Sequence, residues 1–177
     1  EQICDLNPSL PVGLMGFSMG GNCVLRIARD LSKEPIPQLC HTIAISPVIE
    51  PEETCTLIDS SLLIRRYFLR KFDRLYRQKQ EKFPEYKSAN DLLNQKTLLG
   101  LTELSVLRWS EFSSAKMYFD AYKINKNDFA KGNVAVTLMT AKDDPIVSVK
   151  STLALAEGPQ FERVYTNYGG HNGFFER

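Results

Sequence analysis

Residues 16–21 read GFSMGG, and this short stretch decides how the rest of the chain is interpreted. It contains the pattern G-x-S-x-G, with Ser18 between Gly16 and Gly20. Between a strand and a helix this pattern forms a sharp turn, in which strained backbone angles lift the serine hydroxyl above the edge of the sheet. A glycine-rich turn with an idle serine has the same letters, so the flanking segments must decide between the two.

The segments on either side of the turn have the periodicities of a strand and a helix. Pro11–Gly16 is a short apolar run bounded by Pro and Gly, which is typical of a strand with both faces covered. Gly21–Leu31 has apolar residues at helical spacing. These residues are Val24, Leu25, Ile27, Ala28 and Leu31. No Lys follows the glycines and G-x-G-x-x-G is absent, so the turn does not indicate a nucleotide-binding loop.

Both glycines of the pattern are expected to be required, because a side chain at Gly16 or Gly20 would collide across the turn. The backbone N–H of Met19 would face the oxyanion that forms when the serine attacks an acyl carbonyl. A serine hydroxyl is a weak nucleophile unless an imidazole accepts its proton and a carboxylate fixes the tautomer of that imidazole. The chain must therefore supply an acid and then a histidine, in that order.

Further strands and a helix follow in the pattern of a parallel sheet. We predict strands at His41–Ser46, Asn133–Thr140 and Phe161–Asn167, and a helix at Ser148–Gly158. Strands that alternate with helices indicate a parallel α/β sheet. The long middle segment has helical periodicity and no obvious strand. The chain is therefore divided into residues 1–47 with the elbow, an inserted helical cap at 48–132, and the last strands at 133–177.

Only two histidines are present, and only one has the right place in the chain. His41 begins a strand that precedes any candidate acid, so we interpret it as a structural residue. His171 lies in the glycine-rich loop YGGHNGFF after the last predicted strand, where the general base is expected. Asp143 and Asp144 follow the preceding strand. We favour Asp144 as the acid, because an apolar pair that starts the next helix follows it, and Asp143 is the alternative.

The composition is that of an ordinary soluble globular protein, with 177 residues of which 43% are hydrophobic and 24% charged. The 22 basic and 21 acidic residues leave a net charge of +1, which argues against nucleic acid as a partner. The chain has no signal segment and no apolar run near the roughly 20 residues of a membrane span, which favours a cytoplasmic location. It begins without Met, so we expect a piece of a longer protein, and an upstream membrane anchor stays open.

The cysteines are widely spaced, without a C-x-x-C pair and without histidines arranged as zinc ligands. They are Cys4, Cys23, Cys40 and Cys55. We predict free, buried thiols, which favour a reducing compartment. The sequence predicts no metal and no cofactor.

Three motifs in this order resemble one family. GFSMGGN, AKDDPIV and GGHNGFF are similar to the elbow, the acid loop and the histidine loop of the α/β-hydrolase superfamily, and within it of the YheT-like, embryogenesis-associated hydrolases. The resemblance spans Pro11–Phe175. It implies the α/β-hydrolase fold, a mostly parallel sheet with helices on both faces and a helical cap insert. The chain would cover about the C-terminal half to two-thirds of that fold.

The resemblance also implies the chemistry. It indicates a serine hydrolase that cleaves short- to medium-chain acyl esters or acylglycerols, with Ser18 as nucleophile, His171 as base, Asp144 as acid and the Met19 backbone as oxyanion donor. A second donor, worth about 2.7–4 kcal/mol, would lie in the strands that precede the elbow in a complete member. We therefore expect this segment alone to be inactive and poorly folded. The alternatives are acyl transfer to an alcohol and a non-catalytic binding domain.

Leu62–Phe83 combines an aromatic face with a basic face. The predicted aromatic face is Ile64, Phe68, Phe72, Leu75 and Tyr76, and the predicted basic face is Arg66, Arg70, Arg74 and Arg77. Such a helix can lie on an anionic membrane, or it can pack its aromatic face within a cap and turn its arginines to water. We favour the cap helix and keep peripheral membrane contact as the alternative. A second aromatic set is predicted to form cap core: Trp109, Phe112, Tyr118, Phe119 and Tyr122.

Overall fold

The computed structural model describes residues 6, 9–31, 34–87, 90–132 and 134–174. The chain forms two compact units, which we call the sheet unit (Glu1–Glu50 with Tyr122–Arg177) and the helical unit (Pro51–Ala121). The helical unit ends earlier than the predicted insert of residues 48–132. The reason is that Ile124 and Phe129 are apolar and lie in the core of the sheet unit.

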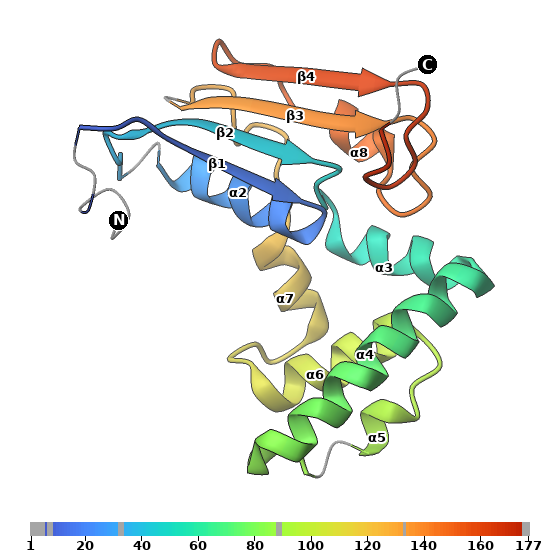
Figure 1. Ribbon diagram of the computed structural model, residues 1–177. Helices are drawn as coiled ribbons and strands as arrows, with labels where there is room; N and C mark the ends of the chain where they lie inside the picture. The colour runs from blue at the N-terminus through green and yellow to red at the C-terminus, as the bar shows by residue number, and fades with distance from the viewer. Residues whose placement is uncertain (1–5, 7–8, 32–33, 88–89, 133, 175–177) are drawn as a thin grey trace. The chain divides into compact units, whose positions relative to one another are not determined.

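The sheet unit contains four parallel strands in the order β1-β2-β3-β4. They are β1 (Val12–Phe17), β2 (Leu39–Ile45), β3 (Ala135–Ala141) and β4 (Phe161–Thr166). Figure 1 shows them side by side, with the first strand at one edge. The predicted parallel α/β sheet is confirmed, and the strand ends differ from the predicted ones by at most two residues, as is usual at element ends.

Two helices of the sheet unit pack on this sheet. The helix α2 (Met19–Asp30) contacts β1 and β2, and the helix α8 (Val149–Leu153) contacts β3. The helix α8 is much shorter than the predicted Ser148–Gly158. The chain leaves the helix because the amide of Ala156 donates to the Lys126 carbonyl at 2.7 Å and Gly158 lies against the backbone of Phe129, where a Cβ would overlap the carbonyl.

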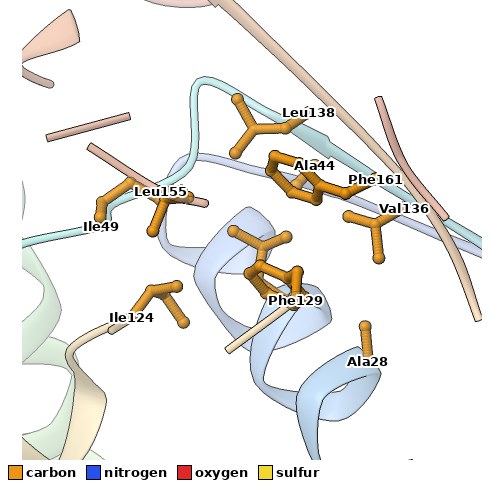
Figure 2. Packing of buried hydrophobic residues seen from close by; sticks show 10 residues of the cluster. Ala28, Ala44, Ile49, Ile124, Phe129, Val136, Leu138, Leu155 and Phe161 are labelled. Atoms are coloured by element: carbon orange, nitrogen blue, oxygen red, sulfur yellow. The ribbon is translucent and has the colours of Figure 1, made fainter. Parts of the chain in front are cut away.

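The core of the sheet unit lies between α2, the sheet and the connecting segments that contain Ile49, Ile124, Phe129 and Leu155 (Figure 2). It contains Leu25, Ala28, Ala44, Ile49, Ile124, Phe129, Val136, Leu138, Leu155 and Phe161. The rings of Phe129 and Phe161 stack with centroids 5.1 Å apart and planes inclined by 6°. The core thus joins segments that are more than a hundred residues apart in the chain.

The opposite face of the sheet is more open than the sequence predicts. Met15 is 58% exposed and Phe17 is 53% exposed, so the prediction that both faces of β1 are covered is wrong within the described residues. Side chains alternate along a strand, and only the face that carries Leu14 packs with α2 and its neighbours. On α2, Ile27 is 41% exposed, although its helical spacing predicts burial.

The helical unit consists of short and long helices joined by tight connections. They are α3 (Pro51–Ser60), α4 (Leu62–Lys82), the 3-10 helix η1 (Pro84–Tyr86), α5 (Asn90–Leu93), α6 (Leu98–Trp109) and α7 (Ala115–Tyr122). The carboxylate of Asp59 accepts hydrogen bonds from the amides of Leu98 and Leu99, at 2.7 and 3.0 Å. A negative charge at this position stabilises the start of α6.

The core of the helical unit is aromatic. Tyr76 is buried, and its ring lies 5.8 Å from that of Trp109, which lies 4.4 Å from the ring of Tyr86. The predicted aromatic face of α4 is wrong at Leu75, which is 42% exposed, whereas Leu69 packs against the core instead. Each position along a helix rotates a side chain by about 100°, so the six positions from Leu69 to Leu75 place the two side chains about 120° apart around the helix.

The second predicted aromatic set does not form one cluster. Trp109 packs in the core of the helical unit, and Phe119 is buried. Tyr122 is assigned to the sheet unit, where the guanidinium of Arg26 lies 4.0 Å from the centre of its ring. The described part of the chain contains no helix that is both long and apolar enough to cross a membrane.

The cysteines differ in exposure. Cys23 and Cys40 are free and exposed, so the prediction that they are buried is wrong. Cys23 lies on the exposed side of α2, and Cys40 stands where the pairing of β2 with β1 shifts register. Cys55 is free and buried, and burial raises its pKa to about 11. Cys4 lies outside the described residues. No group of three His, Cys, Asp or Glu side chains in the described chain is arranged to hold a metal ion.

One buried polar side chain holds three segments of the sheet unit together. Asn22 of α2 is fully buried, and its Nδ2 donates to the carbonyls of Val48 at 2.8 Å and Tyr122 at 2.7 Å. The first carbonyl follows β2, and the second lies at the end of α7. The Asn22 amide group therefore satisfies backbone oxygens that have no strand partner there.

We predict that Asn22→Leu destabilises the protein by about 2–4 kcal/mol, because it leaves two carbonyls without their donor. Urea unfolding of the full-length protein, followed by far-UV circular dichroism, measures the change. The matched control is Asn127→Leu at an exposed position, which we expect to change stability by less than about 0.5 kcal/mol. Equal unfolding midpoints for the two variants would contradict the role given to Asn22.

Candidate active site

The first site residue lies at the turn between β1 and α2. Ser18 has φ 52° and ψ −118°, a conformation that costs about 1–3 kcal/mol for a residue other than glycine. Its amide donates to the Ile45 carbonyl at 2.9 Å, and its own carbonyl accepts from the amides of Asn22 at 3.1 Å and Val48 at 3.3 Å. These three hydrogen bonds hold the strained backbone in place. The turn is therefore the sharp strand-to-helix reversal that the sequence predicts.

The glycines of the turn are used unequally. A Cβ on Gly16 would overlap the carbonyl group of Gly20, so a side chain at Gly16 cannot fit without moving the turn. A Cβ on Gly20 meets nothing within 4 Å, so the prediction that Gly20 must also lack a side chain is wrong. The second tight position is Gly21, where a Cβ would lie 3.0 Å from the Cβ of Pro47. Of the two glycines in the G-x-S-x-G pattern, only Gly16 therefore lacks room for a side chain.

The loop after β3 holds the first acidic candidate. The side chain of Asp144 is fully buried, and its Oδ1 accepts from the amides of Ile146 at 2.8 Å and Val147 at 3.0 Å. The sequence predicts that this apolar pair starts the next helix. That prediction is wrong, because α8 begins only at Val149. The amides of the pair instead fix the carboxylate, which leaves Oδ2 free to face the loop after β4.

The histidine loop brings the three side chains into one row. Nδ1 of His171 lies 2.9 Å from Oδ2 of Asp144, and Nε2 lies 2.9 Å from Oγ of Ser18. Because an ionised carboxylate only accepts hydrogen bonds, the proton of a neutral His171 ring belongs on Nδ1. Nε2 is then the acceptor for the hydroxyl proton of Ser18. The His171 side chain is 15% exposed, so the row is shielded from most of the solvent.

Two glycines shape this loop. Gly169 has φ 154° and Gly170 has φ 52°, both in the range that favours glycine. A Cβ on Gly169 would lie 2.8 Å from the ring of Phe174. The amide of Gly173 donates to the Gly169 carbonyl at 2.9 Å, which closes the turn around His171. The glycine-rich sequence therefore serves a compact loop with a defined histidine position.

The neighbouring aspartate binds the same loop without touching the imidazole. Oδ1 of Asp143 accepts from the amide of Gly170 at 2.8 Å. Lys142 adds two hydrogen bonds, from its Nζ to Oδ1 of Asn167 at 2.8 Å and from its amide to the Thr166 carbonyl at 3.0 Å. The three successive residues 142, 143 and 144 thus each bind the segment after or at the end of β4. Of the two candidates left open by the sequence, Asp144 is the one beside the ring.

The other predicted positions are placed as follows. His41 lies on β2, where its Nε2 is 2.9 Å from Oγ1 of Thr137, and it takes no part in the row. Met19 is the first residue of α2, so its amide has no acceptor within the helix. The positive end of the α2 dipole therefore lies beside the Ser18 hydroxyl.

Solved structures of similar shape are known, and we compared the chain with three of them. An esterase from Pyrococcus furiosus is 18% identical, with a TM-score of 0.48, over 97% of this chain and 49% of that one. The mouse α/β hydrolase domain-containing protein 10 is 17% identical, with a TM-score of 0.49, over 96% and 58%. An α/β fold family hydrolase from Bacillus anthracis is 14% identical, with a TM-score of 0.50, over 96% and 64%.

The Bacillus structure, together with the parallel sheet order, decides the fold. The chain has the α/β-hydrolase fold. It spans about half the length of the Pyrococcus esterase. No protein-family model and no curated protein sequence matches the chain.

Two contributions to this candidate site are not evident from sequence reasoning. Asn22 follows the elbow motif directly, and its buried side chain donates to the Val48 carbonyl. The sequence shows only the helical spacing of the apolar residues around Asn22, which does not indicate this hydrogen bond. Asp143 anchors the loop of His171 through Gly170. The only sequence signal for Asp143 is that it stands beside Asp144, which cannot show that the two carboxylates have different partners.

We predict opposite effects for alanine at the two glycines of the elbow. Gly16→Ala must displace the Gly20 carbonyl and is expected to cost about 1–3 kcal/mol. Gly20→Ala enters open space in the first turn of α2 and is expected to be neutral or stabilising by up to about 1 kcal/mol. Thermal unfolding of both variants tests this pair. A melting temperature lowered equally by both substitutions would contradict the conclusion that a side chain fits at Gly20 but not at Gly16.

Proposed function

We propose that the protein is a serine hydrolase that cleaves carboxylic esters through an acyl-serine intermediate. The observation that carries the proposal is the row Asp144–His171–Ser18, with distances of 2.9 Å at both junctions, on a strained turn at the end of a strand. Each residue has the partner that its role requires. The α/β-hydrolase fold supports the proposal, since its neighbours include proteins described as esterases and hydrolases.

The proposed reaction begins when Nε2 of His171 accepts the proton of Ser18 and the freed oxygen attacks the ester carbonyl. The imidazolium is held and stabilised by Asp144, which the amides of Ile146 and Val147 keep in position. His171 then gives its proton to the leaving alcohol, and the acyl group stays on Ser18. His171 then takes a proton from water, and the resulting hydroxide attacks the acyl carbonyl. As the bond to Ser18 breaks, His171 returns the proton to the serine oxygen, which releases the acid and restores the hydroxyl.

The negative charge that forms on the carbonyl oxygen needs donors. We propose the amide of Met19 as one of them, because it follows Ser18 directly and has no acceptor within α2. The dipole of this 12-residue helix favours negative charge at the same end.

We propose small acyl esters or acylglycerols of short to medium chain length as substrates, and membership of the YheT-like group. The three motifs GFSMGGN, AKDDPIV and GGHNGFF support both, because they carry the residues of the row in the order that the group uses. Three free cysteines in the described chain fit a reducing, cytoplasmic compartment. Acyl transfer to an alcohol uses the same intermediate, and product analysis with and without added ethanol separates it from hydrolysis.

The nucleophile is tested with a fluorophosphonate probe, which reacts covalently with activated serines. We expect the full-length protein to be labelled and Ser18→Ala to lose the label. Ser46→Ala is the matched control, because Ser46 also has a positive φ, of 43°, but is fully buried and has no imidazole partner in the described chain. No labelling of the folded protein would count against an enzyme and for a non-catalytic binding domain.

The assignment of Asp144 as the acid is tested by replacing each of the two aspartates with asparagine. Asp144→Asn puts amide hydrogens opposite Nδ1–H and is expected to lower kcat for a p-nitrophenyl ester by about 10⁴-fold through the wrong tautomer. Asp143→Asn keeps an oxygen for the Gly170 amide and is expected to stay within about threefold of the unaltered protein. If Asp143→Asn lost as much activity as Asp144→Asn, the assignment of the acid would be wrong.

A further inference from the structure

The helix α4 turns a row of cations away from the core of the helical unit. One side of this 21-residue helix packs through Leu69, Phe72 and Tyr76, and Figure 1 shows the helix in green. The outward side borders a shallow hollow of about 420 Å³. The hollow is lined by Leu63, Arg66, Tyr67, Arg70, Lys71 and Arg74. Four of these six side chains are positively charged.

The four positively charged side chains that line the hollow are not neutralised by neighbours in the described chain. Asp73 is the acid nearest in sequence, and both of its oxygens accept from Arg77, at 2.9 and 3.2 Å. Arg65 donates to the Asp59 carbonyl at 3.0 Å, outside the row. No ion pair within the described residues involves Arg66, Arg70, Lys71 or Arg74, which we call the cation row.

Large apolar side chains share this side of the helix. Leu63 is 78% exposed and Tyr67 is 57% exposed, and both line the hollow. Nζ of Lys71 lies 5.4 Å from the centre of the Tyr67 ring, so cation and ring lie together. A helix that only faced water would have polar residues at these positions. The outward side is therefore both basic and apolar.

We propose that this outward side of α4 binds the surface of an anionic phospholipid membrane. The cation row lies at the level of lipid phosphates, while Leu63 and Tyr67 enter the boundary between headgroups and acyl chains. A nucleic acid would bind the cations but leave Leu63 in water, since its backbone offers phosphates and no apolar layer. A membrane supplies both parts of the match.

The proposal does not depend on ester hydrolysis, because it concerns binding by the helical unit alone. The net charge of the whole chain is only +1 and does not produce the expected membrane binding. The positive charge that would bind the membrane is concentrated on α4. Each basic side chain near an anionic surface raises membrane partitioning about fivefold. Three basic side chains together therefore raise membrane partitioning on the order of 100-fold.

Vesicle co-sedimentation of the full-length protein tests the proposal. We expect binding to vesicles of equimolar phosphatidylglycerol and phosphatidylcholine, and none to vesicles of phosphatidylcholine alone. The triple variant Arg66→Glu/Arg70→Glu/Arg74→Glu should lower the partition coefficient by at least about 100-fold. The matched control is Lys126→Glu/Lys131→Glu/Lys150→Glu, which makes the same change in net charge at exposed positions of the sheet unit and should lower it by less than about threefold.

A second variant tests the apolar part of the match. Leu63→Ser/Tyr67→Ser leaves every charge in place and should lower partitioning by about 10-fold or more. Far-UV circular dichroism verifies that each variant is folded, which is expected because the replaced side chains are exposed. The proposal is overturned if the unaltered protein does not bind the anionic vesicles, or if the two triple variants weaken binding equally. It is also overturned if Leu63→Ser/Tyr67→Ser binds as well as the unaltered protein, which would indicate a general polyanion surface.

Discussion

The close approach of two backbones at the elbow is the constraint on which the sheet unit depends. Gly16 at the end of β1 leaves no room for a side chain, because the carbonyl group of Gly20 lies where a Cβ would stand. This approach lets the chain reverse at Ser18 and start α2 at once against the strand it has just left. The strained φ of 52° persists because hydrogen bonds to Ile45, Asn22 and Val48 fix the turn on both sides.

The parallel sheet then determines which residues can meet. All strands run in one direction, so the loops after β1, β3 and β4 leave the sheet at the same edge. Ser18, Asp144 and His171 stand in those three loops, and 153 positions separate the serine from the histidine it contacts. A contact over that sequence distance requires every strand register between them to be correct. The site is thus a consequence of the sheet order and of loops whose tight turns are allowed by glycines and held by the two aspartates.

Much of this arrangement could be predicted from sequence, because turns and periodicities are local signals. The elbow, the parallel sheet and the order of Ser18, Asp144 and His171 follow from such signals. Properties that depend on three-dimensional neighbours could not be predicted. One example is the open space beside Gly20. Another is on α4, where Leu75 is exposed and Leu69 packs against the core. Both depend on packing partners that are distant in the chain.

The two aspartates and the charges of α4 show the same limit at the level of electrostatics. Asp143 and Asp144 are identical in type and adjacent, yet one carboxylate meets a backbone amide and the other an imidazole, because successive side chains leave the loop in different directions. On α4, Arg77 is paired with Asp73. Arg74 has no such partner in the described chain, although it stands beside the same aspartate in the sequence. A sum of charges cannot distinguish these cases, so the chemistry of each group follows from its partners.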